Sequence, residues 1–184
     1  MALTYSQTIP FGAPAPDFDL PGVDDKTHTL ASFASAKILV VIFMCNHCPY
    51  VQACWQRLVD LQNEFGAQGV QLVGINSNDS ATYPEDSLEK MKEYAQKYGQ
   101  NFPYLQDATQ LTAKAYGAVC TPDIFVYDQQ RHLQYHGRID DNWKDQGKVT
   151  KRELAEAITA LLKGDLPPRD QNPSMGCSIK WKPI

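Results

Sequence analysis

Two cysteines separated by two residues are the feature of this chain with the most evident chemistry. Cys45 and Cys48 enclose Asn46 and His47. The thiolate is the nucleophile in disulfide exchange, and a helix N-terminus or a protonated imidazole nearby lowers the pKa of a thiol. Two thiols that reach each other can form and reopen a disulfide. The motif therefore indicates a dithiol redox site.

A structural zinc site is the alternative, because a single Cys-x-x-Cys motif is also half of such a site. Zinc would require a second pair of cysteine or histidine ligands at short spacing. The remaining cysteines (54, 120 and 177) and histidines (28, 132 and 136) form no such pair. We therefore expect redox chemistry and assign neither a metal nor a cofactor to the site.

The residues around the motif predict the elements that position it. Residues 37–44 are apolar and rich in β-branched side chains, which is typical of a strand buried on both faces. After Cys48, apolar residues recur at helical spacing and predict a helix over 49–65, which ends near Gly66 and Gly69. The two cysteines would thus lie where a central strand leads into a helix.

The rest of the chain predicts one α/β domain. Residues 10–36 are expected to form an irregular start with a short hairpin around 21–26, and no internal repeat or linker follows. Strands are predicted at 70–76, 123–128 and 133–139, and helices at 85–98, 109–116 and 151–163. This order places parallel strands in the middle of a mixed sheet and an antiparallel hairpin at one edge. With the dithiol at the end of the first central strand, the pattern resembles the thioredoxin fold.

The Thr121-Pro122 pair supports that resemblance, because thioredoxin-fold proteins carry a cis-proline before the third strand. A cis bond before proline costs little compared with any other cis peptide. The resemblance implies that Thr121 and Pro122 lie beside the sulfurs, pair with an extended substrate and keep metal away from the thiolate.

Longer motifs resemble one branch of this superfamily. The N-terminal segments 15–22 and 29–33 are similar to the entry segment of peroxiredoxins and redoxins. The finer matches are residues 45–51 (CNHCPYV), 76–79 (NSND), 83–87 (YPEDS), 137–142 (GRIDDN) and 174–182 (SMGCSIKWK). Together, over about residues 10–182, they resemble the peroxiredoxin-like thioredoxin-family proteins of the AhpC/TSA branch, often described as probable thiol-disulfide isomerases or thioredoxins.

One departure from true peroxiredoxins bears on the activity that this resemblance implies. Those enzymes have a threonine or serine three residues before a single peroxidatic cysteine, and a proline four residues earlier still. Counted back from Cys48, these positions hold Cys45 and Val41. Disulfide exchange is therefore the stronger interpretation, and weak thiol peroxidase activity is an alternative, because any thiolate of low pKa reacts slowly with peroxide.

The fold also implies roles for the motif residues. Cys45, as the more exposed cysteine of the pair, would be the nucleophile, and Cys48 the thiol that releases the mixed disulfide. Asn46 and His47 are predicted to support the site. A protonated His47 near Cys45 would stabilise the thiolate over the disulfide, while the alternative is that His47 points into solvent.

The other cysteines are predicted to differ in role. Cys54 lies on an apolar helix face and is expected to be an inert core residue. Cys120 and Cys177 are possible additional redox thiols, with Cys120 more in keeping with a packed wall of the site. The tail that holds Cys177, residues 165–184, follows a core of about 10–164 and should be irregular but ordered. Ile179 and Trp181 alternate around Lys180, so we expect a short extended piece there that buries both apolar side chains.

Composition sets the remaining expectations. A net charge of −4 without any cluster of lysine and arginine argues against nucleic acid or an anionic membrane as partner. No segment approaches a membrane span, and the N-terminus lacks the features of a signal peptide, so we expect a cytoplasmic protein. Protein or small-molecule disulfides and thiols are the expected substrates, and a cellular dithiol the expected reductant.

A metal-binding or copper-delivery protein on the same fold is a second functional hypothesis. Copper chaperones of this fold use two cysteines and a distant histidine, for which His132 or His136 could serve. In those proteins three residues usually separate the cysteines, whereas two separate them here. The spacing therefore favours the redox interpretation.

Overall fold

A central five-stranded sheet organises the molecule. The computed structural model describes residues 3–183. The sheet has the strand order β6-β5-β4-β8-β9, with β4 and β5 parallel, β5 and β6 parallel, and the other neighbours antiparallel. Its strands are β4 (Ile38–Phe43), β5 (Val70–Asn76), β6 (Tyr104–Gln106), β8 (Asp123–Tyr127) and β9 (Leu133–His136). The predicted mixed sheet with an antiparallel hairpin at its edge is thereby confirmed.

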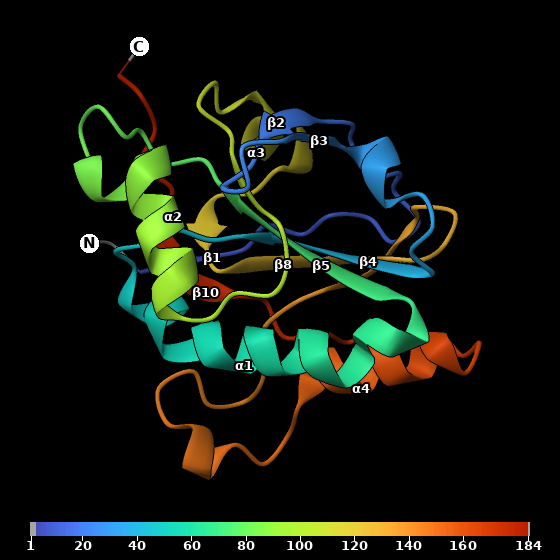
Figure 1. Ribbon diagram of the computed structural model, residues 1–184. Helices are drawn as coiled ribbons and strands as arrows, with labels where there is room; N and C mark the ends of the chain where they lie inside the picture. The colour runs from blue at the N-terminus through green and yellow to red at the C-terminus, as the bar shows by residue number, and fades with distance from the viewer. Residues whose placement is uncertain (1–2, 184) are drawn as a thin grey trace.

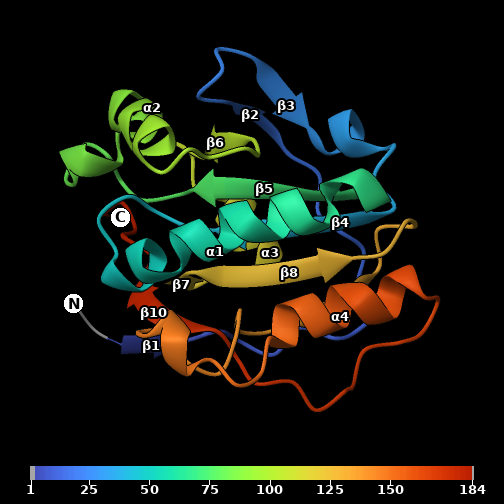
Figure 2. The same ribbon diagram turned by 60° about the horizontal axis from the view of Figure 1, so that its bottom comes forward.

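The helices cover both faces of this sheet. Figure 2 shows α1 and α4 across one face and α3 behind the other. The α-helices are α1 (Pro49–Phe65), α2 (Leu88–Lys97), α3 (Leu111–Tyr116) and α4 (Glu153–Leu162), and the short 3₁₀ helices are η1 (Leu30–Phe33), η2 (Gly66–Gln68), η3 (Pro84–Asp86) and η4 (Gln146–Lys148). No helix among residues 3–183 is long and apolar enough to cross a membrane.

Strand β4 is buried on both faces, because its residues alternate between two apolar cores. Val40 and Ile42 pack with the inner faces of α1 and α4, whereas Val41 and Phe43 pack with α3 and the N-terminal segment. Strand side chains point alternately to opposite faces, so a continuous apolar run is what a strand with helices on both sides requires. This sandwiched position holds the end of β4 rigidly.

A second, smaller sheet lies at the end of the central sheet where the motif is found. Its strands are β1 (Leu3–Tyr5), β10 (Met175–Ser178) and β7 (Cys120–Thr121), in the order β1-β10-β7. Figures 1 and 2 show β10 next to the first turn of α1, although the two are far apart in sequence. The predicted N-terminal hairpin is also present, as β2 (Asp19–Pro21) paired with β3 (Thr27–Thr29).

The tail departs from expectation in two respects. It was expected to be irregular, but β10 pairs antiparallel with both β1 and β7. Ile179 is buried as expected, whereas Trp181 is 39% exposed, so the prediction that it is buried is wrong. Only one of the two alternating apolar residues reaches the core. The Trp181 ring instead faces outward, where the Lys114 ammonium lies 5.8 Å from its centroid.

Candidate redox site

The Cys45–Cys48 loop joins the end of β4 to the start of α1. Cys48 is the N-cap residue of α1 and Pro49 is the first residue of the helix. Proline suits this position because the N–H group that it lacks would have no partner within the helix. The helix begins and ends where the sequence predicts, and it brings the unpaired N–H groups of its first turn towards the Cys48 sulfur.

Thr121 brings the two sulfurs together from the opposite side. The Thr121-Pro122 peptide is cis, as predicted. The Thr121 hydroxyl lies 3.4 Å from the Cys45 sulfur, and the Cys48 thiol, when protonated, donates to the Thr121 carbonyl oxygen at 3.2 Å. Thr121 of β7 thus contacts both cysteines, Cys45 through its hydroxyl and Cys48 through its carbonyl oxygen.

Exposure does not distinguish the two cysteines, although Cys45 was expected to be the more exposed. Cys45 is 1% exposed and Cys48 is fully buried. Both thiols are free, and together with the Cys177 sulfur they form part of one apolar core cluster. The reduced site is therefore closed in this structure.

A hydrogen bond between the two thiols separates their acidities. The pKa of Cys48 is lowered to about 5, mainly because Cys45 donates a hydrogen bond to its sulfur; Cys177 and the Val51 N–H group add to this effect against the cost of burial. The pKa of Cys45 is raised well above its usual value by the same bond, by burial and by the charge of Asp86. Cys48 is therefore the more acidic thiol of the pair.

His47 is held by a buried carboxylate rather than directed into solvent. Its Nδ1 atom lies 2.7 Å from Asp86 Oδ2, and its ring stacks on Tyr83 with the centroids 5.5 Å apart. The bond to Asp86 raises the pKa of His47 above its usual value. Burial alone would raise the pKa of Asp86, but hydrogen bonds from His47 and Asn78 outweigh it and lower that pKa.

Asn46 fixes the backbone of the loop. Its N–H group donates to Asp86 Oδ1 at 2.8 Å, its side-chain amide donates to the Glu85 carbonyl at 2.7 Å, and its side-chain oxygen accepts from the Tyr104 hydroxyl at 2.9 Å. Asn78 donates to the second oxygen of Asp86 at 2.7 Å. Asp86 is therefore the centre of a hydrogen-bond network that orients both residues between the cysteines.

Sequence reasoning missed the role of Asp86. The segment 83–87 was noticed as a motif, but its acidic residues were interpreted as the start of a charged helix. The two adjacent acids differ in burial: Glu85 is exposed, whereas Asp86 is fully buried beside the helix. Burial of a single carboxylate depends on tertiary packing, which local spacing does not reveal.

The three remaining cysteines lie in different surroundings. Cys177 on β10 faces Thr121 in the strand register and is buried in the same core cluster as Cys45 and Cys48. The Cys120 thiol instead donates towards the Pro122 carbonyl at 3.8 Å, and burial raises its pKa. Burial likewise raises the pKa of Cys54 to about 12, as expected for an inert core residue.

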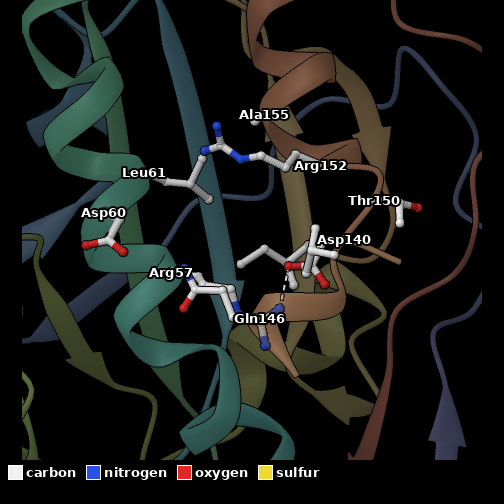
Figure 3. A pocket seen from close by; sticks show the side chains of 10 residues that line it. Arg57, Asp60, Leu61, Asp140, Gln146, Thr150, Arg152 and Ala155 are labelled. Atoms are coloured by element: carbon white, nitrogen blue, oxygen red, sulfur yellow. Dashed lines mark hydrogen bonds and ion pairs between the residues drawn. The ribbon is translucent and has the colours of Figure 1, made fainter. Parts of the chain in front are cut away.

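A cavity lies between α1 and α4 and belongs to the scaffold. It has a volume of about 320 Å³, and Arg57 and Asp140 form an ion pair in its wall (Figure 3). Arg57 also donates to the carbonyl oxygens of Asn142 and Trp143 at 3.0 and 2.7 Å. No cysteine lines this cavity. We therefore infer that Arg57 holds the loop after β9 in place.

The fold and the dithiol together define a thioredoxin-like protein of the redoxin class. The AhpC/TSA family model matches residues 11–136, more than half of the chain, so the protein belongs to the AhpC/TSA family. The match spans the motif, the Asp86 loop and the cis-proline, and leaves β10 and α4 outside it.

Three known proteins are similar to this chain in sequence or in fold. It is 24% identical over 164 residues to the thiol-disulfide oxidoreductase ResA of Geobacillus thermodenitrificans, covering 86% of this chain and 82% of the relative. An uncharacterized conserved protein from Geobacillus kaustophilus is 45% identical with a TM-score of 0.96, over 100% of this chain and 98% of the other. The thioredoxin domain of a thiol-disulfide oxidoreductase from Bacteroides vulgatus shares the fold, with 15% identity and a TM-score of 0.61 over 70% and 89% of the two chains.

Proposed function

We propose that this protein is a thiol-disulfide oxidoreductase in which Cys45 and Cys48 interconvert between dithiol and disulfide. The observation that carries the proposal is that both sulfurs meet at Thr121, whose hydroxyl lies 3.4 Å from the Cys45 sulfur and whose carbonyl oxygen lies 3.2 Å from the Cys48 sulfur. The name of the Geobacillus thermodenitrificans relative agrees with it. We further propose that the protein acts in the cytoplasm on protein or small-molecule disulfides, with a cellular dithiol as reductant.

The exchange follows from the charge on Cys48. The Cys48 thiolate attacks one sulfur of a substrate disulfide, that S–S bond breaks, and the first substrate thiolate leaves. Cys45 then attacks the Cys48 sulfur, the mixed disulfide breaks, and the proton of Cys45 passes to the second leaving thiolate. The protein loses two electrons and the substrate gains them. The reverse sequence oxidises a substrate dithiol.

A redox titration with disulfide mapping tests this proposal. The protein is equilibrated in glutathione buffers, quenched with acid, alkylated and mapped by mass spectrometry. We expect a Cys45–Cys48 disulfide with a reduction potential within the range of about −270 to −120 mV known for thioredoxin-fold dithiols. The Cys54→Ser variant is the matched control and should titrate like the wild type. Failure of Cys45 and Cys48 to pair at any buffer ratio would refute the proposal.

The same titration identifies the attacking sulfur. Cys45→Ser/Cys177→Ser leaves Cys48 without a partner thiol and should be captured as a mixed disulfide at residue 48, whereas Cys48→Ser should react much more slowly at residue 45. Faster reaction of Cys45 in the second variant would restore the role first expected for it from the fold. The dithiol assignment itself would stand in either case.

Binding of a thiophilic metal is a second candidate function, favoured by one observation. Ligand atoms of Cys45, His47 and Asp86 all lie within 4.8 Å of one another. The two histidines considered from sequence lie elsewhere: His136 bonds to Asp123 at 2.8 Å and His132 is exposed. Titration of the reduced protein with Cu(I) tests this function, and stoichiometric binding that His47→Gln weakens would support it.

A further inference from the structure

Strand β10 brings a third thiol to the dithiol. Cys177 faces Thr121 in the antiparallel register, and Thr121 contacts the sulfurs of both Cys45 and Cys48. The Cys177 side chain is buried in the same core cluster as Cys45 and Cys48, and burial together with the neighbouring Cys48 thiol raises the pKa of Cys177 to about 12. Cys48 therefore lies between two thiols, Cys45 from its own loop and Cys177 from the tail.

Both flanks of β10 are fixed at the site. On one side, Gly176 packs so closely on β7 that a Cβ atom there would lie 1.9 Å from the Thr121 carbonyl oxygen. On the other side, the Lys180 N–H group donates to the Asn78 side chain at 2.8 Å, and the Lys180 carbonyl accepts from the Asp79 N–H group at 2.9 Å. The tail is thus bonded to the loop that carries Asp86, and this bonding holds Cys177 against Cys48.

We propose that Cys177 is a third redox thiol, which forms a disulfide with Cys48 in exchange for the Cys45–Cys48 disulfide. The inference rests on the proposed function and extends it by a thiol that lies outside the matched family segment. Cys48 would be common to both disulfides. The tail would thereby take over the disulfide bond from Cys45, or return it to Cys45.

The exchange balances without an external oxidant. The protein first becomes oxidised at Cys45–Cys48 by a substrate disulfide. Cys177 loses its proton and attacks the Cys48 sulfur, the Cys45–Cys48 bond breaks, and Cys45 leaves as a thiolate that takes up a proton. One S–S bond forms and one breaks, so no electrons enter or leave the protein. In a mixed disulfide at Cys48, the same attack by Cys177 releases the substrate thiol.

The arrangement singles out Cys177 over Cys120, although both lie in the small sheet. The Cys120 thiol is directed towards the Pro122 carbonyl, whereas Cys177, unlike Cys120, belongs to the buried cluster that contains Cys45 and Cys48. A disulfide requires sulfurs that close to about 2.05 Å with a defined dihedral angle, so the two thiols must share one site. Cys120 therefore serves as the matched control.

Disulfide mapping of a protein that lacks Cys45 tests the proposal. Cys45→Ser is reduced, treated with excess glutathione disulfide, quenched with acid, alkylated and mapped. We expect most molecules to carry a Cys48–Cys177 disulfide, and Cys45→Ser/Cys120→Ser to behave in the same way. Glutathione retained on Cys48 with Cys177 still open to alkylation after denaturation would overturn the proposal.

A second set of variants tests whether β10 delivers the thiol. Cys45→Ser/Gly176→Ala should lose most of the Cys48–Cys177 disulfide and retain glutathione on Cys48, because the new methyl group displaces β10 from Thr121. Cys45→Ser/Gly147→Ala places a methyl group on an exposed loop and should keep the disulfide. An equal yield in both variants would contradict the role of β10.

Failure of this proposal and failure of the dithiol function are distinguishable in Cys177→Ser. In that variant the Cys45–Cys48 disulfide should form as in the wild type. Its absence from both proteins would refute the dithiol function. Its presence, together with an unreactive Cys177 in Cys45→Ser, would refute only the relay. Circular dichroism before oxidation verifies that each variant is folded.

Discussion

Two buried ion pairs, one in the middle of α1 and one just before the helix, serve different purposes. Arg57 pairs with Asp140 within the helix body, and both side chains are at least nine-tenths buried. His47 pairs with Asp86 just before the helix, where Asp86 is fully buried and His47 is 20% exposed. Both pairs connect α1 to a loop from another part of the chain. Only the second lies beside a reactive sulfur.

The difference lies in the cation. A guanidinium keeps its charge at any pH at which a protein folds, so a pair of this kind stabilises the fold but does not act as a switch. An imidazole changes its charge near neutral pH, so the His47 pair can adjust the site. The first pair fastens the loop that carries Trp143, and the second orients the residues between the cysteines. The chain uses a permanent charge for the scaffold and a titratable charge for the site.

Removal of Arg57 should have the largest effect on stability. In Arg57→Met, the Asp140 carboxylate would remain buried without a cation and two loop carbonyls would lose their donor. Breaking a buried pair in this way costs about 3–5 kcal/mol of unfolding free energy. Urea denaturation measures it. The control is Arg152→Met, because Arg152 pairs with Glu64 on the surface and should cost less than about 1 kcal/mol.

The same variant sharpens the comparison between the pairs. Arg57 lies in the wall of a cavity that no cysteine lines, so the alkylation rate of Cys48 in the folded protein should stay close to that of the wild type. A change in this rate as large as that caused by loss of Asp86 would show that the two pairs act together.

Asp86→Asn should have the next largest effect. It should lower the free energy of unfolding and raise the reactivity of the two cysteines. Asp86 accepts hydrogen bonds from Asn46, Asn78 and His47, and an amide nitrogen would face one of these donors. Leaving buried donors without partners costs about 1–3 kcal/mol. The cysteine loop should loosen, and alkylation of the dithiol should become faster. Denaturation and alkylation rates measure the two effects.

The neighbouring exposed acid supplies the control for this variant. Glu85→Gln changes the charge by the same amount one residue away, and its side chain lies on the surface. It should alter neither the free energy of unfolding nor the alkylation rates of the cysteines appreciably. Equal effects of the two substitutions would mean that net charge, rather than the network around Asp86, governs the loop.

The sequence predicted the scaffold of the site well because that scaffold depends on local patterns. The apolar run before Cys45 and the helical spacing after Cys48 set β4 and α1, and α1 has the predicted bounds. These two elements follow from periodicity, which is a property of short segments. Thr121-Pro122 was placed beside the sulfurs by the resemblance to thioredoxin-fold proteins.

The parts that were missed depend on contacts between distant segments. Strand β10 has only four residues, and its pairing with β7 joins positions that lie more than fifty residues apart. Asp86 is recognisable as a site residue only when the loop after β5 is placed against the cysteine loop. Trp181 was assigned to the core by alternation with Ile179, but alternation does not say whether a core reaches both residues.

The potential of the dithiol should respond to His47 by a smaller amount. The imidazolium stabilises the thiolate relative to the disulfide, so His47→Gln should make the disulfide harder to reduce. A potential lower by about 30 mV corresponds to roughly 1.4 kcal/mol. Glutathione titration measures the shift, and His28→Gln is the control because His28 pairs with Asp24 in the N-terminal hairpin. An unchanged potential would leave His47 with a structural role alone.

The smallest expected effect is a pH dependence of stability carried by the His47 pair. The folded pKa of His47 is raised, so the stability that the pair contributes is fully present below about pH 6.5 and is lost as the pH rises through the folded pKa. The pKa of Cys48 is lowered to about 5, so its contribution has the opposite sign: it is present above the unfolded pKa and is lost as the pH falls through 5. Subtracting the unfolding free energies of His47→Gln from those of the wild type cancels the cysteine contribution. That difference should decrease between pH 6 and 8, whereas the difference between the wild type and Arg57→Met should stay level, because both of those proteins contain His47 and Cys48. A level difference for His47 would remove the distinction between the two pairs.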